Sequence, residues 1–267
     1  MKPATPLEQS PDPKIEAFGI LAEGKGFEPL IGFPTPVFKT GAFNHSAILP
    51  RHKNGRFYRR IHFFANIPKL FMEPIEFDRA LSSLLSEDDP LRVRFERWRR
   101  FLQRELTFSH SESVCHTTEH VERVLLFALL LGRELEVSSD DLDALALCAV
   151  FHDTRRHDDD LDVGHGDRAA AYYREYASAH GRNVDDRVER IIARHDRHDR
   201  ISEEKFRKEG ADDETLLLYR IFKDADAIDR FRFGPKALNE RYLRTSAARN
   251  LLPLLRPFVL RLTGYEA

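Results

Sequence analysis

The period of the apolar residues between about residue 76 and residue 263 is the strongest constraint on the fold. Apolar side chains recur there at intervals of three and four residues, which is the period of an amphipathic α-helix. No segment alternates between apolar and polar residues over the length that a half-buried strand needs. The sequence therefore predicts an all-α domain. The expected helices span 76–86, 89–107, 117–135, 139–154, 165–180, 184–197, 213–231, 235–244 and 246–263.

The segment 1–71 differs from the helical domain expected at 72–267. It is rich in Pro, Gly and Phe and has no sustained period, so we expect a disordered or irregular extension. Residues 26–48 also back-translate, with ordinary codons, into the complementary strand of a serine transfer-RNA gene, with its T-loop, anticodon and D-arm segments in order. The first hypothesis is that the true start lies downstream, near Met72. The alternative is a genuine N-terminal extension.

Composition narrows the class of protein further. The net charge of -2 gives no electrostatic case for nucleic acid or an acidic membrane surface as a partner. The two cysteines, Cys115 and Cys148, are too few for a disulfide framework and indicate a reducing compartment. No apolar run reaches the length of a membrane span, and the N-terminus lacks a signal-peptide pattern. We therefore expect a cytoplasmic protein without a membrane partner, and the sequence predicts no oligomeric state.

Four of the expected helices carry an apolar stripe that leads to a histidine or an aspartate. These stripes belong to 117–135, 139–154, 184–197 and 213–231. The residues at their ends are His120, the adjacent pair His152 and Asp153, His195, and one or more of Asp224, Asp226 and Asp229. A single histidine on an apolar face is usually an ordinary core residue. Four such helices favour a shared metal ion, because buried imidazoles and carboxylates are costly unless they are paired or bound to a cation.

These positions resemble the signature of the HD superfamily of metal-dependent phosphohydrolases. That signature is a histidine, a His-Asp pair and a later aspartate, each on a separate helix. Here they are His120 in H-V-E-R-V, the pair His152–Asp153, and Asp226 in K-D-A-D-A-I-D. The resemblance covers roughly residues 107–250 and implies an HD-domain helical bundle whose metal is held by these four residues. Asp224 is the alternative last ligand, because it flanks the apolar face about equally.

The segment HDTRRHDDDLDVGHGDRAA, residues 152–170, resembles one subset of the superfamily. In that subset an arginine, an aspartate-containing loop and a His-Gly pair follow the His-Asp pair. Here these are Arg156, the loop with Asp159 and Asp162, and His165–Gly166. In relatives with two metals, the histidine that opens this helix and a histidine on the next helix bind the second ion. The resemblance therefore implies His165 and His195 as further ligands. Arg155 departs from the subset, in which glycine is common at this position.

The resemblance implies hydrolysis of a phosphomonoester or phosphodiester, with a nucleotide or another small phosphorylated metabolite as substrate. Asp153 would position the attacking water. Arg156 would bind phosphate oxygens, because a guanidinium grips phosphate through two parallel hydrogen bonds. With three or more imidazoles, the expected cofactor is one or two divalent ions of Mn, Fe, Zn, Ni or Co, since Mg and Ca prefer oxygen ligands.

Two other functions share the same ligand pattern. One is a non-catalytic regulatory or binding module that keeps the metal for stability, and the other is a di-iron oxygenase of the HD type. Several nearby polar residues have simpler expected roles. Arg123 and Lys223 are weaker candidates for phosphate binding and are expected in surface ion pairs. His116 is expected to be an ordinary loop or helix-end residue, Asp159 to lie in a solvated loop, and Asp229 to make a structural hydrogen bond or ion pair.

Overall fold

The computed structural model describes residues 74–265. All regular structure in this range is helical, which confirms the predicted all-α class. The expected extension at 1–71 and the boundary at residue 72 lie outside the described residues. None of the described helices is long and apolar enough to cross a membrane. The elements are α2 (Pro74–Leu84), α3 (Pro90–Glu105), α4 (Thr118–Glu134), α5 (Ser139–Phe151), α6 (His165–Ala179), α7 (Asp186–Arg194), α8 (Asp199–Lys208), α9 (Asp213–Ile228), the 3-10 segments η2 (Asp229–Phe233) and η3 (Glu240–Tyr242), and α10 (Ser246–Leu262).

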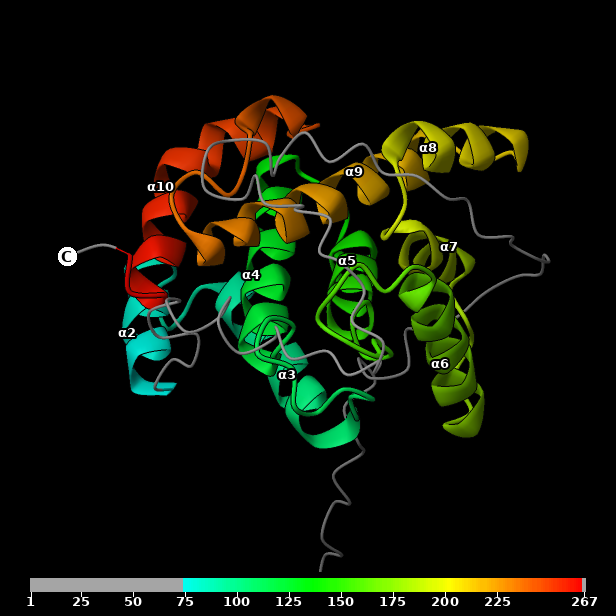
Figure 1. Cartoon of the computed structure of the whole chain (residues 1–267), viewed down its shortest axis with the longest axis horizontal. Helices are drawn as coiled ribbons and strands as arrows, with labels where there is room; N and C mark the ends of the chain where they lie inside the picture. Colours follow the sequence, from blue (N-terminus) through cyan, green and yellow to red (C-terminus); the bar gives the residue numbers. More distant parts are fainter. Residues whose placement is uncertain (1–73, 266–267) are drawn as a thin grey trace, which may run out of the picture.

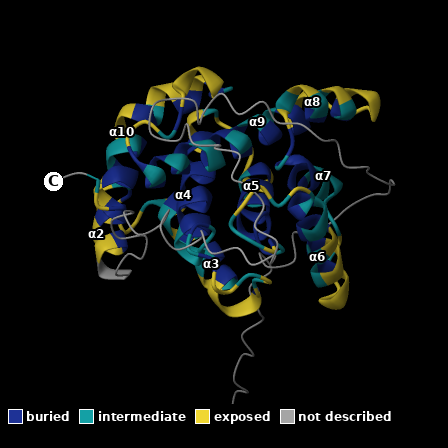
Figure 2. Cartoon of the chain, viewed as in Figure 1, coloured by how far each residue is buried: buried dark blue, intermediate teal, exposed yellow. Residues whose placement is uncertain are grey.

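Helix α4 forms the centre of the molecule. Its residues from His120 to Gly132 are all buried, and a helix buried on every face must have neighbours all round. Helix α5 packs along it and α9 crosses both, while α3 and α10 cover its remaining sides (Figure 1). Helices α6 and α7 form a pair, and α7 packs against α5. Figure 2 shows the buried faces of these helices turned toward α4 and α5, which places the core around them.

The apolar stripes lie in this core, as predicted. Leu142 and Val184, at the starts of their stripes, are partly buried and pack against the core. The other stripe residues are fully buried: Val124, Phe127, Ala128, Leu131, Leu145, Ala146, Ala149, Val188, Ile191, Ile192, Leu218, Ile221, Phe222, Ala225 and Ile228. The stripes therefore lead into the core, and the polar residues at their ends meet there.

One predicted helix was wrong, and one helix of the structure was not predicted. The helix expected over 235–244 is only the single 3-10 turn η3, and the chain there is held by long side chains, with Arg249 donating to the carbonyl of Leu243. Helix α8 was not predicted. Only Ser202 and Phe206 are buried in it, so its sequence lacks the apolar stripe on which the other predictions rested.

Candidate metal centre

The six residues predicted as metal ligands converge where the inner ends of five helices meet. They are His120 in the first turn of α4, His152 at the C-terminal cap of α5 with Asp153 after it, His165 at the start of α6, His195 at the C-terminal cap of α7, and Asp226 near the end of α9. Five of them are buried. The side chain of Asp226 is 32% exposed and marks the open side of the site.

The pair His152–Asp153 lies in a turn rather than in the helix predicted over 139–154. Helix α5 ends at Phe151, whose carbonyl oxygen accepts from the amide of Thr154 at 3.1 Å and from its hydroxyl at 2.7 Å. These bonds close a turn directly after the helix. The turn directs the two adjacent side chains of His152 and Asp153 toward the same site.

All four histidines direct Nε2 toward the centre of the site. Their Nδ1 atoms lie 2.7 to 2.9 Å from Asp229 Oδ2 (His120) and from the carbonyl oxygens of Ala149 (His152), Asp162 (His165) and Ile192 (His195). A carbonyl oxygen or an ionised carboxylate can only accept a hydrogen bond, so Nδ1 carries the proton and Nε2 offers its lone pair. Metal-binding histidines are fixed in this way by a partner on the other ring nitrogen.

The first subsite consists of Nε2 of His120 and His152, Oδ2 of Asp153 and Oδ1 of Asp226. His120 Nε2 lies 3.3 Å from His152 Nε2, 3.5 Å from Asp153 Oδ2 and 3.6 Å from Asp226 Oδ1. His152 Nε2 lies 3.4 Å from Asp153 Oδ2. Two ligand atoms that are each about 2.1 Å from a tetrahedral ion lie about 3.4 Å apart. These four distances are therefore those expected between ligands of one divalent ion, and His120, His152 and Asp226 form a group that could hold it.

The second subsite uses the other oxygen of Asp153. Asp153 Oδ1 lies 3.2 Å from His165 Nε2 and 3.7 Å from His195 Nε2, and these two nitrogens are 2.9 Å apart. Two lone pairs that face each other at this distance repel unless positive charge lies beside them. Asp153 thus offers one carboxylate oxygen to each subsite, as a carboxylate that bridges two cations does.

Arg156 lies beside the second subsite, and it is 5% exposed. Its Nε donates to the carbonyl of Asp158 at 3.2 Å, and its Nη2 donates to the carbonyl of Asp160 at 2.6 Å. Its Nη1 lies 3.1 Å from His165 Nε2 and 3.5 Å from Asp153 Oδ1. The contact with a phosphate group that the sequence suggested for this residue stays a prediction.

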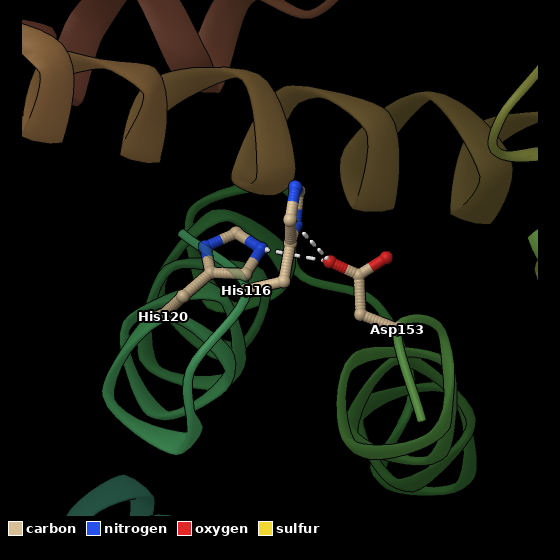
Figure 3. Close-up of side chains that lie close together, drawn as sticks. All are labelled: His116, His120 and Asp153. Atoms are coloured by element: carbon tan, nitrogen blue, oxygen red, sulfur yellow. Dashed lines mark hydrogen bonds and ion pairs between the residues drawn. The ribbon is translucent and has the colours of Figure 1, made fainter. Parts of the chain in front are cut away.

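The prediction that His116 is an ordinary loop residue was wrong. Its Nδ1 donates to Asp153 Oδ2 at 2.6 Å, and Figure 3 shows the rings of His116 and His120 directed at the same carboxylate oxygen. Burial lowers the pKa of His116 to about 4, although Asp153 opposes that shift, so the ring is neutral and donates its Nδ1 proton. His116 lies one helical turn before His120, and this spacing is the only signal in the sequence that could have pointed to it.

The loop that carries His116 is fixed at two points. Asp159 accepts from the hydroxyl of Ser113 at 2.5 Å and from the amide of Val114 at 3.1 Å. Arg232 donates from Nε to the carbonyl of Cys115 at 3.1 Å. Asp159 is therefore not the solvated residue that the sequence suggested, because its carboxylate ties the 157–163 loop to this one.

Asp229 fixes the ring of His120, which is one of the residues of the first subsite. It accepts from Nδ1 of His120, and it pairs with Nε of Arg123 at 2.5 Å, which confirms its predicted structural role. Arg123 is itself buried, so the prediction of a surface ion pair was wrong for it. Lys223 is also not in a simple surface pair: its Nζ donates to the carbonyl of His195.

Asp224, the alternative ligand, faces away from the site. It is fully buried and accepts from the amide of Thr245 at 2.8 Å, from the hydroxyl of Thr245 at 2.9 Å and from the amide of Arg244 at 2.9 Å. These bonds fix the start of α10. The structure therefore places Asp226, and not Asp224, beside His120 and His152.

The electrostatics of the site favour a bound cation. Burial opposes ionisation of Asp153, but His152 and His116 outweigh it and hold its pKa well below the usual range. The pKa of Asp226 is lowered in the same way, against burial, by His152 and His120. Burial lowers the pKa of His195, whereas Asp153 raises that of His152 in spite of burial. Two ionised carboxylates in a largely buried site attract positive charge.

Comparison with known proteins agrees with this geometry. A profile of the HD domain family matches residues 117–230, which run from the N-terminal cap of α4 into η2 and contain all six predicted ligands. A search of curated proteins and a search of solved structures each find no match. The matched range contains the His, His-Asp and Asp positions in order, on α4, after α5 and on α9. Residues 117–230 therefore form an HD domain.

Proposed function

We propose that the chain is a metal-dependent phosphohydrolase that cleaves a phosphomonoester or phosphodiester bond in a small metabolite such as a nucleotide. The observation that carries this proposal is the pair of subsites on the two oxygens of Asp153. Two positions for positive charge on either side of one carboxylate suit a phosphoryl group, whose oxygens carry the charge of the transition state. The HD domain, which is typical of metal-dependent hydrolases, supports the same class of reaction.

The residues around the site would have different roles in this reaction. A divalent ion in the first subsite would lower the pKa of a water molecule and polarise a phosphoryl oxygen. Asp153 accepts a hydrogen bond from His116, which fixes the plane of its carboxylate so that it can orient the attacking water. Asp226 is the most exposed of the six predicted ligands, so a substrate would approach the site from its side. Nη1 of Arg156 is the guanidinium nitrogen nearest to Asp153 and would donate to a phosphate oxygen.

A hydrolysis screen tests the proposal. The protein is purified with its bound metal measured, and it is assayed with Mn²⁺ against a chromogenic phosphatase reporter and a panel of nucleotides and sugar phosphates. Asp153→Ala is expected to lose about a thousandfold or more in kcat, because it removes a group from both subsites. Asp140→Asn is the matched control, since it neutralises an exposed carboxylate in the first turn of α5.

Three other results of this screen would each lead to a different conclusion. Hydrolysis that survives Asp153→Ala would overturn the mechanism. A protein that binds metal but turns over no phosphate ester would be a regulatory or binding module. An iron-loaded preparation that forms a product only in the presence of oxygen would identify an oxygenase.

A further inference from the structure

The second subsite already has a cationic neighbour from the chain itself. Nη1 of Arg156 lies 3.1 Å from His165 Nε2 and 3.5 Å from Asp153 Oδ1, which are two of the three ligand atoms of that subsite. A guanidinium group carries a positive charge in proteins. It therefore supplies permanent positive charge where the facing lone pairs of His165 and His195 require it.

Arg156 is also held in this position. Its Nε and Nη2 donate to the carbonyls of Asp158 and Asp160, and the residue is 5% exposed. The loop that offers these carbonyls is itself tied down, because Arg168 pairs with both oxygens of Asp162 at 2.6 and 2.7 Å. The guanidinium cannot swing into solvent without breaking the hydrogen bonds that hold the loop.

A metal ion in the second subsite would lie close to this guanidinium. An ion about 2.1 Å from His165 Nε2 can be no more than about 5 Å from Nη1. A buried pair of like charges at such a distance is poorly screened by solvent and salt, so each charge opposes the other. The first subsite is less affected, because Arg156 approaches Oδ1 of Asp153 and not Oδ2.

We propose that the guanidinium of Arg156 is the second cation of this site. The wild-type chain then holds one divalent ion, in the first subsite, and the His165–His195 subsite takes a metal only when Arg156 is replaced by a neutral residue. In catalysis the guanidinium would stand opposite the single ion and neutralise the phosphate oxygens from that side. This inference rests on the metal centre of the proposed function, but not on the identity of the substrate.

Metal counting tests it without any assay of activity. The full-length protein is stripped with a chelator, titrated with Mn²⁺ and analysed for bound equivalents. The wild type and Arg156→Lys are expected to bind one equivalent tightly. Arg156→Gln is expected to bind two, with the dissociation constant of the second equivalent lowered about tenfold or more. Arg155→Gln is the control, because its guanidinium lies over the ring of Tyr172 and donates to the carbonyl of Thr107.

A double variant locates the gained ion. Adding His165→Ala to Arg156→Gln should return the count to one equivalent, whereas His165→Ala alone should leave the wild-type count unchanged. Anomalous diffraction from Mn²⁺-soaked crystals should show one ion beside Asp226 in the wild type and a second beside His195 in Arg156→Gln.

The number of Mn²⁺ equivalents bound by the wild type can by itself contradict the inference. Two equivalents of similar affinity in the wild type would contradict it, even if Arg156→Gln failed to fold. A folded Arg156→Gln that still binds one equivalent would contradict it as well. No bound metal in any variant would instead contradict the metal centre, and with it the proposed function.

Discussion

Asp224 and Asp226 lie two positions apart on α9, yet their carboxylates have different partners. Asp224 holds the start of α10 through Arg244 and Thr245. Asp226 faces His120 across the first subsite. An apolar stripe specifies a helix face only to within about one residue on either side, so the sequence left both aspartates as candidates. The packing of α10 against α9 separates them.

Substitution of these two residues should separate stability from metal binding. Asp224→Ala leaves buried donors without an acceptor and is expected to lower the free energy of unfolding by about 2–4 kcal/mol, with metal binding retained. Asp226→Ala is expected to abolish tight Mn²⁺ binding while changing the unfolding free energy of the metal-free protein by less than about 1 kcal/mol. Urea denaturation and Mn²⁺ titration measure the two effects. The reverse pattern would make Asp224 the ligand.

The lowered pKa of Asp229 predicts that part of the free energy of unfolding is lost in acid. Burial opposes its ionisation, but Arg123 and the hydrogen bond from His120 outweigh burial and lower its pKa from 3.8 to about 2. A carboxyl group with a lowered pKa stabilises the fold above its unfolded pKa, and this contribution disappears as pH falls from about 4 to 2. The shift corresponds to about 2 kcal/mol.

Urea denaturation of the metal-free protein at pH 7, 4 and 2.5 measures this contribution. The difference in unfolding free energy between the wild type and Asp229→Asn should shrink as pH falls below 4. A difference that stays constant over this range would show that Asp229 titrates in the same way in the folded and unfolded chains.

At the scale of elements, the junction of α6 and α7 builds the second subsite. Helix α6 starts after Gly164, whose φ of +90° suits glycine and which has no side chain to cap the helix. Asp196, just beyond the end of α7, supplies the missing acceptor and takes the amide of Gly164 at 2.8 Å. This bond joins the N-terminal cap of α6, the residue before His165, to the residue that follows His195 at the end of α7.

Gly166 is needed for this close approach. A Cβ at this position would lie 2.8 Å from the carbonyl oxygen of Ile192 and 3.1 Å from that of Ala193, and both are backbone atoms of α7. Gly166→Ala should therefore force α6 away from α7, lower the unfolding free energy by about 1–3 kcal/mol and separate His165 from His195.

Two measurements check this prediction. Urea denaturation gives the loss of stability, and the NMR resonances of the histidine rings report on the site. Gly181→Ala is the control: its methyl group would meet nothing within 4 Å, so its cost of about 1 kcal/mol should come from its positive φ alone, without a change in the site. A Gly166→Ala protein with wild-type stability and resonances would contradict the argument.

At the scale of the molecule, the metal centre joins parts of the chain that are far apart in sequence. His120 and its partner Asp229 are 109 residues apart, and the six ligands come from α4, the end of α5, α6, the end of α7 and α9. An ion that binds only when these helices are assembled stabilises the folded state by an amount that grows with its concentration.

Metal should therefore raise the stability of the whole fold. Mn²⁺ at a hundred times its dissociation constant is expected to add about 3 kcal/mol to the unfolding free energy, and a chelator should remove the gain. Urea denaturation with and without Mn²⁺ checks this, with Asp226→Ala as the variant that should show no gain. Equal stabilisation of that variant would indicate that the ion binds elsewhere.

The sequence by itself determined the all-α class, the apolar stripes and the positions His120, His152 and Asp153. Helical period and the order of residues along one helix are local properties, so they can be seen in the sequence alone. The same locality explains the errors. Helix α8 has no stripe, and the segment 235–244 is held by more distant residues: Arg256 donates to the carbonyl of Pro235, and Asp224 accepts from the amide of Arg244.

Only the tertiary structure decided which groups complete the site. The loop before α4 places His116 on Asp153, the hydrogen bonds of Arg156 to its loop place its guanidinium beside His165, and α10 removes Asp224 from the centre. Each of these depends on how a turn or a neighbouring helix directs a side chain. These turns and helices are in turn held by contacts between distant segments, such as Asp159 with Ser113, which no local period records.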